Sequence, residues 1–183
     1  MRDSIKIIGA LTLVCILCAL TLSLVAGAAK DRTAFNEKKA IESAIFSIVP
    51  GCKNIKEIRA GKDVLYKIIN KKGELIGYGF LSQGQGYQGK IKIMTVTNPS
   101  FKKLLGIEII DSQETPGLGA RINEHFFKDQ FKGLNIAVPI DYTKTKPAKN
   151  NEIKAITGAT ISSKSVVNIL NKTIEKLRSE VAK

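Results

Sequence analysis

The N-terminal part of the chain carries a long apolar run without a charged side chain. Residues 7–29 read IIGALTLVCILCALTLSLVAGAA. As a helix rising ~1.5 Å per residue, this run extends about 35 Å, enough to cross a hydrocarbon core of ~30 Å with some tilt. The sequence therefore predicts one transmembrane helix at residues 7–29, preceded by a short tail, residues 1–6.

A cleaved secretory signal is the competing interpretation of this run. Residues 26–28, Ala-Gly-Ala, satisfy the small-x-small pattern of a cleavage site. The apolar region of a secretory signal usually has only ~7 to 15 residues, so the longer run favours a retained anchor. Basic residues are nearly balanced across the run, and the short tail favours a cytoplasmic N-terminus. On either interpretation, the part from Lys30 onward is expected outside the cytoplasm.

The cysteines and the charge exclude several classes of function. Cys15 and Cys18 lie inside the apolar run, where a thiol behaves as a small hydrophobe, and Cys52 has no partner, so we expect neither a disulfide nor a metal site. The net charge is +13, from 29 Lys and Arg against 16 Asp and Glu. The lysines are scattered and lack the interleaved aromatic residues that stack on bases. We interpret them as a solvated basic surface near a membrane, without a nucleic-acid partner.

The rest of the 183-residue chain reads as one small domain after an amphipathic stem. Residues 30–50 have apolar side chains at helical spacing, and Pro50-Gly51 ends that pattern. Strand-like runs follow at residues 64–69, 75–81, 90–98, 104–110 and 134–139, with a hairpin turn at 71–74. A short helix is expected at residues 119–131, with Ile122, Phe126, Phe127 and Phe131 on its inner face. A second helix is expected from about Ser162 to the end, after a lysine-rich loop at 141–152. Residues 51–183 are therefore predicted to form an α+β domain of antiparallel strands and flanking helices.

Five hydroxyl residues surround the start of the last predicted helix. The stretch AITGATISS, residues 155–163, is followed by a further serine, and its hydroxyls belong to Thr157, Thr160, Ser162, Ser163 and Ser165. From the residues alone, an ordinary Ser/Thr helix cap is the simpler interpretation. A helix N-terminus with small neighbouring residues would also suit a phosphate, because its amide groups and partial positive charge favour an anion.

A second unusual stretch, ETPGLGA, covers residues 114–120. Its proline and glycines predict a rigid, low-profile loop at the end of a strand. Taken alone, a structural turn before a helix is the simpler interpretation, and Glu114 does not outweigh it. The glycine-rich segment at residues 84–89 is likewise either a flexible loop or a turn close to a ligand.

Together, ETPGLGA, AITGATISS and the anchor resemble the G subunit of the Rnf complex, the ion-translocating ferredoxin:NAD oxidoreductase. The C subunit of the sodium-pumping NADH:quinone oxidoreductase is related and shares the same domain. The resemblance covers nearly the whole chain. It implies an extracytoplasmic FMN-binding domain that carries FMN covalently, as a phosphoester on a threonine.

The resemblance assigns expected roles to particular residues. Thr160 would be the FMN acceptor, and a flavin transferase would attach the cofactor. The remaining expected cofactor-binding residues are Thr157, Gly158, Ala159 and Ile161 around the phosphate, and Glu114, Thr115, Leu118 and Gly119 near the flavin. Tyr78 and Tyr87, beside the glycine-rich turn, are further candidates. Lys154 departs from the family pattern, which usually has an aspartate at that position. No catalytic acid–base pair is expected.

The resemblance also implies a function. The chain would be an electron-transfer subunit of a membrane complex that couples ferredoxin:NAD oxidoreduction to translocation of sodium ions or protons. It would not translocate ions alone, because its apolar run has no ionisable group other than thiols. Other membrane and peripheral subunits would be its partners in the cell membrane. The alternatives are the FMN subunit of a sodium-translocating NADH:quinone oxidoreductase and a non-redox, membrane-anchored binding module.

Overall fold

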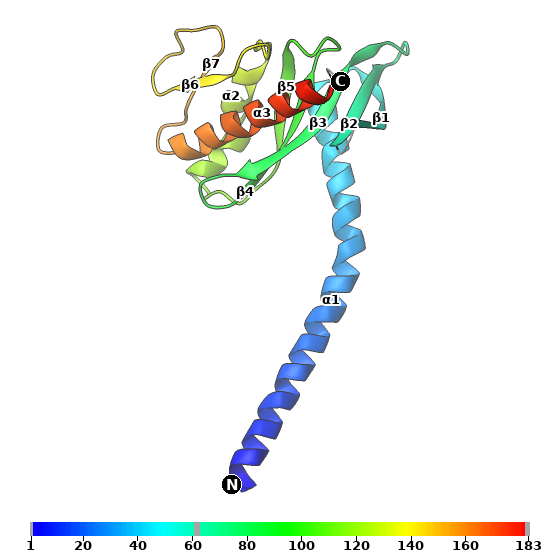
Figure 1. Cartoon of the computed structure of the whole chain (residues 1–183), viewed down its shortest axis with the longest axis vertical. Coiled ribbons are helices and arrows are strands. Elements are labelled where there is room, and N and C mark those ends of the chain that lie inside the picture. Colours follow the sequence, from blue (N-terminus) through cyan, green and yellow to red (C-terminus); the bar gives the residue numbers. More distant parts are fainter. Residues whose placement is uncertain (1, 61–62, 182–183) are drawn as a thin grey trace. The chain divides into compact units, whose positions relative to one another are not determined.

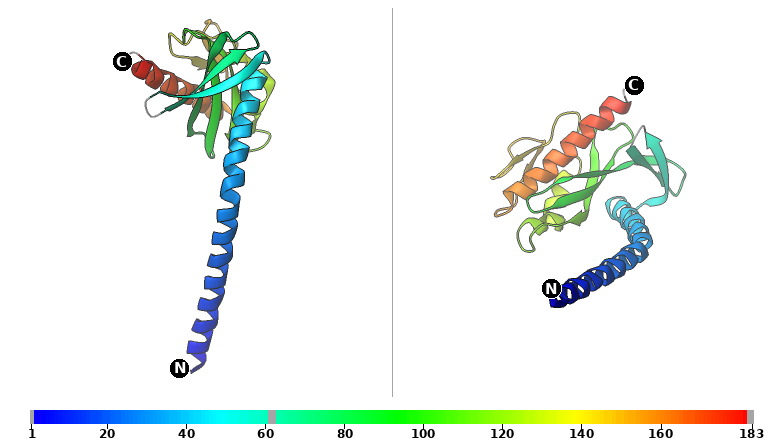
Figure 2. Two further views of the ribbon diagram at one scale, coloured as in Figure 1. Left: turned by 90° about the vertical axis from the view of Figure 1, so that its right-hand side faces the viewer. Right: turned by 60° about the horizontal axis from the view of Figure 1, so that its bottom comes forward.

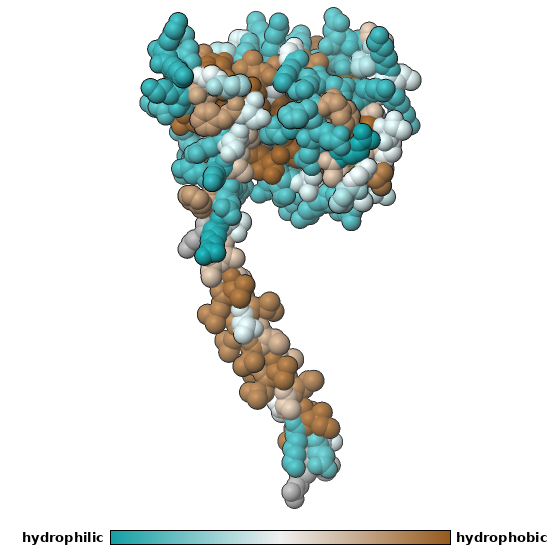
Figure 3. Space-filling model, turned by 180° about the vertical axis from the view of Figure 1, so that it is seen from behind, coloured by the Kyte–Doolittle hydropathy of each residue, from teal (hydrophilic) through white to brown (hydrophobic). Residues whose placement is uncertain are grey.

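A computed structural model describes residues 2–60 and 63–181, which divide into two compact units, Met1–Ala40 and Ile41–Lys183. The long helix α1, Arg2–Ile48, makes up the described part of the first unit and extends into the second (Figure 1). It is the one helix in the described part of the chain that is long and apolar enough to span a membrane. Figure 3 shows apolar side chains along it, and the predicted span at residues 7–29 lies within it.

The second unit is built on a five-stranded antiparallel sheet in which each strand pairs with the next along the chain. Its strands are β1 (Cys52–Ala60), β2 (Asp63–Asn70), β3 (Leu75–Gln85), β4 (Lys90–Thr97) and β5 (Leu104–Ser112). The sequence did not predict β1. Its residues CKNIKEIRA are mostly polar, and an edge strand of this kind needs few apolar side chains because it is only partly covered.

Two hydrophobic cores cover the two faces of this sheet. One face packs against α3, Thr160–Val181, through Val166, Val167, Leu170 and other buried side chains. The opposite face packs against the end of α1, where Ile41, Ala44 and Ile45 are buried with residues of β2 and β4. Figure 2 shows the sheet between these two helical segments. The structure therefore confirms the predicted α+β class with flanking helices.

The helix predicted at residues 119–131 is broken into three short pieces. They are η1 (Gly119–Asn123), α2 (His125–Lys128) and η2 (Asp129–Phe131). Ile122, Phe127 and Phe131 are fully buried, as the spacing predicted. Phe126 was expected on the same inner face but is 48% exposed, and the Arg121 guanidinium lies 5.2 Å from the centre of its ring.

The segment between η2 and α3 differs from the prediction. Residues 134–139 do not form a strand. Instead, β6 (Asp141–Thr143) and β7 (Glu152–Lys154) form a small parallel pair within the region expected to be a lysine-rich loop.

This segment is held by hydrogen bonds from two side-chain amides instead of by further strand pairing. The Asn171 amide accepts from the Ile140 N–H and donates to the Ile140 carbonyl, at 2.9 and 2.8 Å. The Gln130 amide makes the same pair of bonds with the main chain of Lys154, at 2.7 and 3.2 Å. A pattern of apolar residues cannot reveal such bonds, because the groups involved are polar.

One ion pair inside the second unit gives a test of the fold. Lys128 donates to Glu108 of β5, and both side chains are largely buried. Replacing Lys128 with alanine leaves that carboxylate without its cation, so we expect the free energy of unfolding to fall by ~2 kcal/mol. The double variant Lys128→Met/Glu108→Gln should lose less, because it leaves no unpaired charge. Thermal unfolding of the full chain in detergent measures both, and equal losses in the two variants would contradict this explanation.

Candidate functional site

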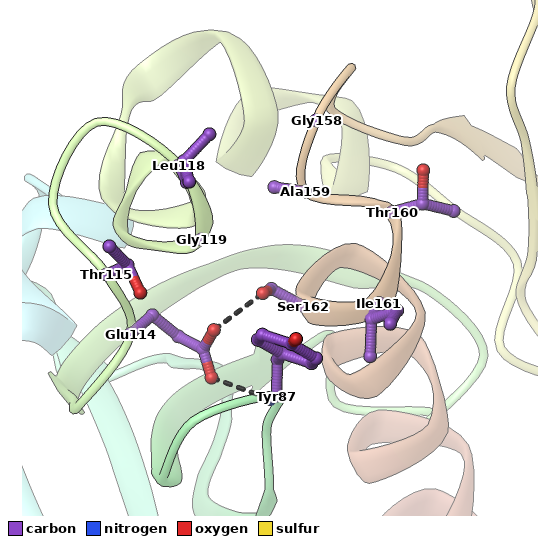
Figure 4. A pocket seen from close by; sticks show the side chains of 10 residues that line it. All are labelled: Tyr87, Glu114, Thr115, Leu118, Gly119, Gly158, Ala159, Thr160, Ile161 and Ser162. Atoms are coloured by element: carbon purple, nitrogen blue, oxygen red, sulfur yellow. Dashed lines mark hydrogen bonds between the residues drawn. The ribbon is translucent and has the colours of Figure 1, made fainter.

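A cavity of about 410 Å³ lies at the N-terminus of α3, where three separate segments of the chain meet (Figure 4). The segments are the β3–β4 turn, the loop after β5, and the start of α3. The residues that line it are Tyr87, Glu114, Thr115, Leu118, Gly119, Gly158, Ala159, Thr160, Ile161 and Ser162. Both unusual stretches of the sequence thus face one cavity, although they lie some forty residues apart.

The hydroxyl groups at the start of α3 differ in whether they make hydrogen bonds within the protein. Ser162 and Ser163 are buried and engaged: Ser162 donates to a Glu114 oxygen at 2.6 Å, and Ser163 donates to the Ala159 carbonyl at 3.0 Å. Ser163 also accepts from the Ile156 N–H at 3.0 Å. Thr160 is half-buried, lines the cavity, and makes no side-chain hydrogen bond to any residue that the structure describes. Its hydroxyl is therefore available to a ligand.

Local geometry at the start of α3 leaves backbone donors near Thr160. Gly158 has a φ of +84°, which reverses the chain before the helix and which side chains disfavour. The Ser163 N–H donates to the Ala159 carbonyl at 3.0 Å and so begins the helical pattern. The amides of residues 160–162 precede it and have no acceptor within the helix. They lie at the positive end of a long helix, where an anionic group is stabilised.

Glu114 is the central polar residue of the site and is only 6% exposed. Its Oε1 accepts from the backbone N–H groups of Tyr87 and Gln88, at 2.7 and 3.1 Å. Its Oε2 accepts from the Ser162 hydroxyl at 2.6 Å. One buried carboxylate therefore connects the β3–β4 turn, the loop after β5 and α3. Successive backbone N–H groups that converge on one oxygen form an anion-binding concavity, which suits an ionised carboxylate.

Two glycines make room for this carboxylate. A Cβ at Gly86 would lie 2.2 Å from Glu114 Oε1, and a Cβ at Gly119 would lie 2.4 Å from Oε2. At Gly119 the Ser162 hydroxyl would also lie within 2.6 Å. The final glycine of ETPGLGA is thus required by a close approach of side chains.

Thr115 holds the same turn from the other side. Its hydroxyl donates to the side-chain carbonyl of Gln88. Gly86 and Gly89 close the turn through a backbone bond of 2.7 Å, from the Gly86 N–H to the Gly89 carbonyl. Tyr87, at the tip, is 66% exposed. Glu114 and Thr115, which were expected beside a flavin, therefore also fix the shape of this turn.

A second cavity, of about 320 Å³, lies along the segment that leads into α3. It is lined by Arg121, Phe126, Gln130, Lys154, Ala155, Ile156 and Thr157. Thr157 lines this cavity and not the first one, unlike the other residues predicted to bind the cofactor. Lys154 has its main chain fixed by Gln130 and its side chain exposed. Glu152, two residues earlier, accepts from the Ala148 and Lys149 N–H groups, which hold the pKa of its carboxyl below the usual range.

The first cavity suits a ligand with a phosphate at one end and an apolar ring at the other. Its volume lies within the ~300 to 1,000 Å³ that is typical of small-molecule sites. The helix start supplies amide donors and the Thr160 hydroxyl, while Tyr87, Leu118 and Ile161 are large apolar side chains that remain more than half exposed at its edge. FMN has this division between a phosphate and a flat ring, so the residues present fit it.

The structure adds one residue to the expected set and separates the two tyrosine candidates. Ser162 was counted among the hydroxyls but was not expected to line the cavity. Tyr87 was only a candidate, and the glycine-rich turn around it was the available signal. Tyr78 was an equal candidate, but it stacks on Phe101 with ring centres 4.9 Å apart and does not line the cavity.

Comparison with known proteins identifies the domain that contains this cavity. The FMN-binding domain family matches residues 86–175. The G subunit of the sodium-translocating ferredoxin:NAD oxidoreductase complex of Acetobacterium woodii is 32% identical over 174 residues, which cover 86% of this chain and 83% of that protein. The G subunit of the ion-translocating oxidoreductase complex of Methanosarcina acetivorans is 33% identical over 115 residues, 63% of this chain and 58% of that protein.

Solved structures support the same fold. The C subunit of the sodium-translocating NADH-quinone reductase of Parabacteroides distasonis aligns with a TM-score of 0.57 at 21% identity, over 67% of this chain and 74% of that one. NqrC of Shewanella oneidensis aligns with a TM-score of 0.56 at 17% identity, over 69% and 67%. At 17 and 21% identity, the solved structures support the fold alone. The family assignment rests on the match at 32% identity over 86% of this chain. The chain contains an FMN-binding domain and belongs to the family of the G subunits of ion-translocating oxidoreductase (Rnf) complexes.

Proposed function

We propose that this chain carries FMN as a phosphoester on Thr160 and passes electrons through it within an ion-translocating ferredoxin:NAD oxidoreductase complex. The observation that carries the proposal is the single cavity shared by ETPGLGA and the start of α3, which has Thr160 among its lining residues. When bound, the flavin supplies reversible electron transfer. A covalent link would keep it from being lost outside the cytoplasm.

The chain's own residues have a limited set of tasks in this function. The Thr160 oxygen would form a P–O bond to the FMN phosphate while a P–O bond to the leaving oxygen breaks. The hydroxyl proton would go to that leaving oxygen, so the product is protein plus FMN minus one water. The amides at the start of α3 stabilise the remaining negative charge of the phosphodiester. Leu118 and Ile161 provide apolar surface to the ring and exclude water from it. No residue needs to transfer a proton, because an electron relay requires positioning and a suitable electrostatic environment.

The proposed setting is the cell membrane, with α1 as a single-pass anchor, the N-terminus in the cytoplasm and the flavin domain on the other side. The partners would be the other membrane and peripheral subunits of the complex, together with a flavin transferase that modifies Thr160. The matches at 32 and 33% identity to proteins named as G subunits of ion-translocating complexes favour ferredoxin:NAD oxidoreduction over the quinone reductase alternative. A non-redox binding module would not explain why Thr160, at the cavity, keeps a hydroxyl without a hydrogen-bond partner among the described residues.

Peptide mass spectrometry tests this proposal. Trypsin releases residues 155–164 as one peptide, because Lys154 precedes it and Lys164 ends it. Full-length protein coexpressed with a flavin transferase should yield this peptide with the added mass of one FMN minus one water, located on Thr160 by fragmentation. The denatured protein should also show a fluorescent band in a gel. Unmodified peptide and no flavin fluorescence, with an active transferase present, would reject the proposal.

A further inference from the structure

We infer that Tyr87 is an aromatic contact of the flavin ring, and that Glu114 and Thr115 are positioning residues that hold Tyr87 at the cavity. This inference rests on the proposed function, because it concerns the same site. The inference goes beyond the sequence, which offered Tyr87 and Tyr78 as equal candidates and placed Glu114 and Thr115 themselves near the flavin. It follows from what those side chains bond to in the structure.

The first step is that the polar groups of Glu114 and Thr115 are directed toward the β3–β4 turn. Both carboxylate oxygens of Glu114 already have donors: the Tyr87 and Gln88 N–H groups on one, and Ser162 on the other. Thr115 donates its hydroxyl to Gln88. A ligand would have to displace these buried bonds to reach the carboxylate, which costs free energy. Their geometry favours support of the turn over direct contact with a ring.

The second step is that the supported turn presents an aromatic side chain that has no other role in the fold. Tyr87 is 66% exposed, and its hydroxyl makes no hydrogen bond within the described residues. Figure 4 shows its ring between the Glu114 carboxylate and Ile161, and Tyr87 is one of the residues that line the cavity. A large exposed aromatic with a rigid backbone is typical of a binding surface, because ring–ring contact adds to the burial of its area. The flat isoalloxazine ring is the matching partner.

The third step makes the inference measurable. The chain has no tryptophan and four tyrosines. Excited flavin is quenched by electron transfer from a tyrosine or tryptophan in contact with it. Of the four, Tyr66 is buried against α1, Tyr78 stacks on Phe101, and Tyr142 packs on the other core. Only Tyr87 lines the cavity, so quenching of a flavin there reports on one residue.

The test is the fluorescence lifetime of the flavin on full-length, flavinylated protein in detergent. Wild-type protein should show a short, strongly quenched lifetime. Tyr87→Phe should lengthen it severalfold while leaving flavin absorption nearly unchanged, because phenylalanine keeps the ring but is not oxidised by excited flavin. Tyr142→Phe is the matched control and should leave the lifetime short.

Variants of the two positioning residues use the same measurement. Glu114→Ala should produce a mixture of short and long lifetimes, because the Tyr87 and Gln88 N–H groups lose the carboxylate that accepts their hydrogen bonds. Glu114→Gln should restore most of the short lifetime, since an amide oxygen can still accept both N–H groups. Lys128→Ala lowers stability away from the cavity and should leave the lifetime unchanged, which separates positioning from general loss of stability.

The outcomes distinguish this inference from the proposed function. Protein whose mass shows one FMN, but whose lifetime is the same in Tyr87→Phe and wild type, overturns the role of Tyr87 alone. A single short lifetime in Glu114→Ala overturns the positioning role. Protein that never gains FMN rejects the proposed function, and this inference with it.

Discussion

Thr160→Ala is expected to abolish covalent attachment of FMN, so that protein coexpressed with a flavin transferase keeps its unmodified mass. The physical reason is that the oxygen that would bond to phosphorus is gone. Neighbouring hydroxyls cannot replace it. Ser162 and Ser163 are buried and committed to Glu114, Ala159 and Ile156, so their release would break the start of α3.

Three further variants make the result specific. Thr157→Ala removes a hydroxyl that faces the second cavity and should leave the mass gain intact. Ser165→Ala removes a half-buried hydroxyl farther along α3 that lines neither cavity, with the same expected result. Thr160→Ser keeps an oxygen at the same position and should retain attachment, in part or in full. A full mass gain in Thr160→Ala, or its loss in Thr157→Ala, would assign the acceptor to another residue.

Gly119→Ala is expected to destabilise the chain strongly, although it adds only one methyl group to the site. The new Cβ would lie 2.4 Å from Glu114 Oε2, 2.6 Å from the Ser162 hydroxyl and 3.0 Å from Glu114 Cβ. Because the carboxylate is buried and accepts three hydrogen bonds, it cannot move without losing them. We expect the free energy of unfolding to fall by ~3 kcal/mol, from overpacking and from lost bonds to a charged group. FMN attachment should fall as well, since the cavity is distorted.

Gly117→Ala is the matched control two residues earlier. Nothing lies within 4 Å of a Cβ there, but the φ of +76° disfavours any side chain. Its cost should therefore be only about 1 kcal/mol, from the left-handed backbone. Thermal unfolding measures both variants.

The double variant Gly119→Ala/Glu114→Ala tests the mechanism. If the new methyl group acts by expelling the carboxylate, the two changes should destabilise the chain by clearly less than their sum, because they share one contact. Additive effects would show that the collision with Glu114 is not the cause.

Pattern and propensity predicted most of the fold correctly. Alternating apolar residues located β2 to β5, and helical spacing located α3, because buried faces impose their period on the sequence. The same rule explains the failures. β1 is an edge strand with mostly polar residues, and β6 and β7 are short and depend on amide bonds from Asn171 and Gln130. None of these three strands has apolar residues at a regular spacing that the sequence could reveal.

The candidate site was predicted unevenly for a related reason. Eight of the nine expected residues line the first cavity, because two short stretches contain them, and the cavity brings both stretches together. Thr157 is the exception. It precedes Gly158, whose positive φ turns the chain so that residues on either side face different cavities. A linear motif does not reveal that reversal.

The sequence alone therefore determined the properties that depend on local composition. The apolar run at residues 7–29 is long enough to span a bilayer whatever it packs against, and the hydroxyls around Thr160 mark a helix start. Only the tertiary structure decided which hydroxyl is free, why Glu114 is buried, and which aromatic ring lies at the cavity. Those properties depend on hydrogen bonds between residues that are far apart in the sequence: Glu114 and Tyr87 are separated by 27 positions, and Glu114 and Ser162 by 48. Such contacts arise from the closure of loops by the packed sheet and α3, and no local pattern encodes them.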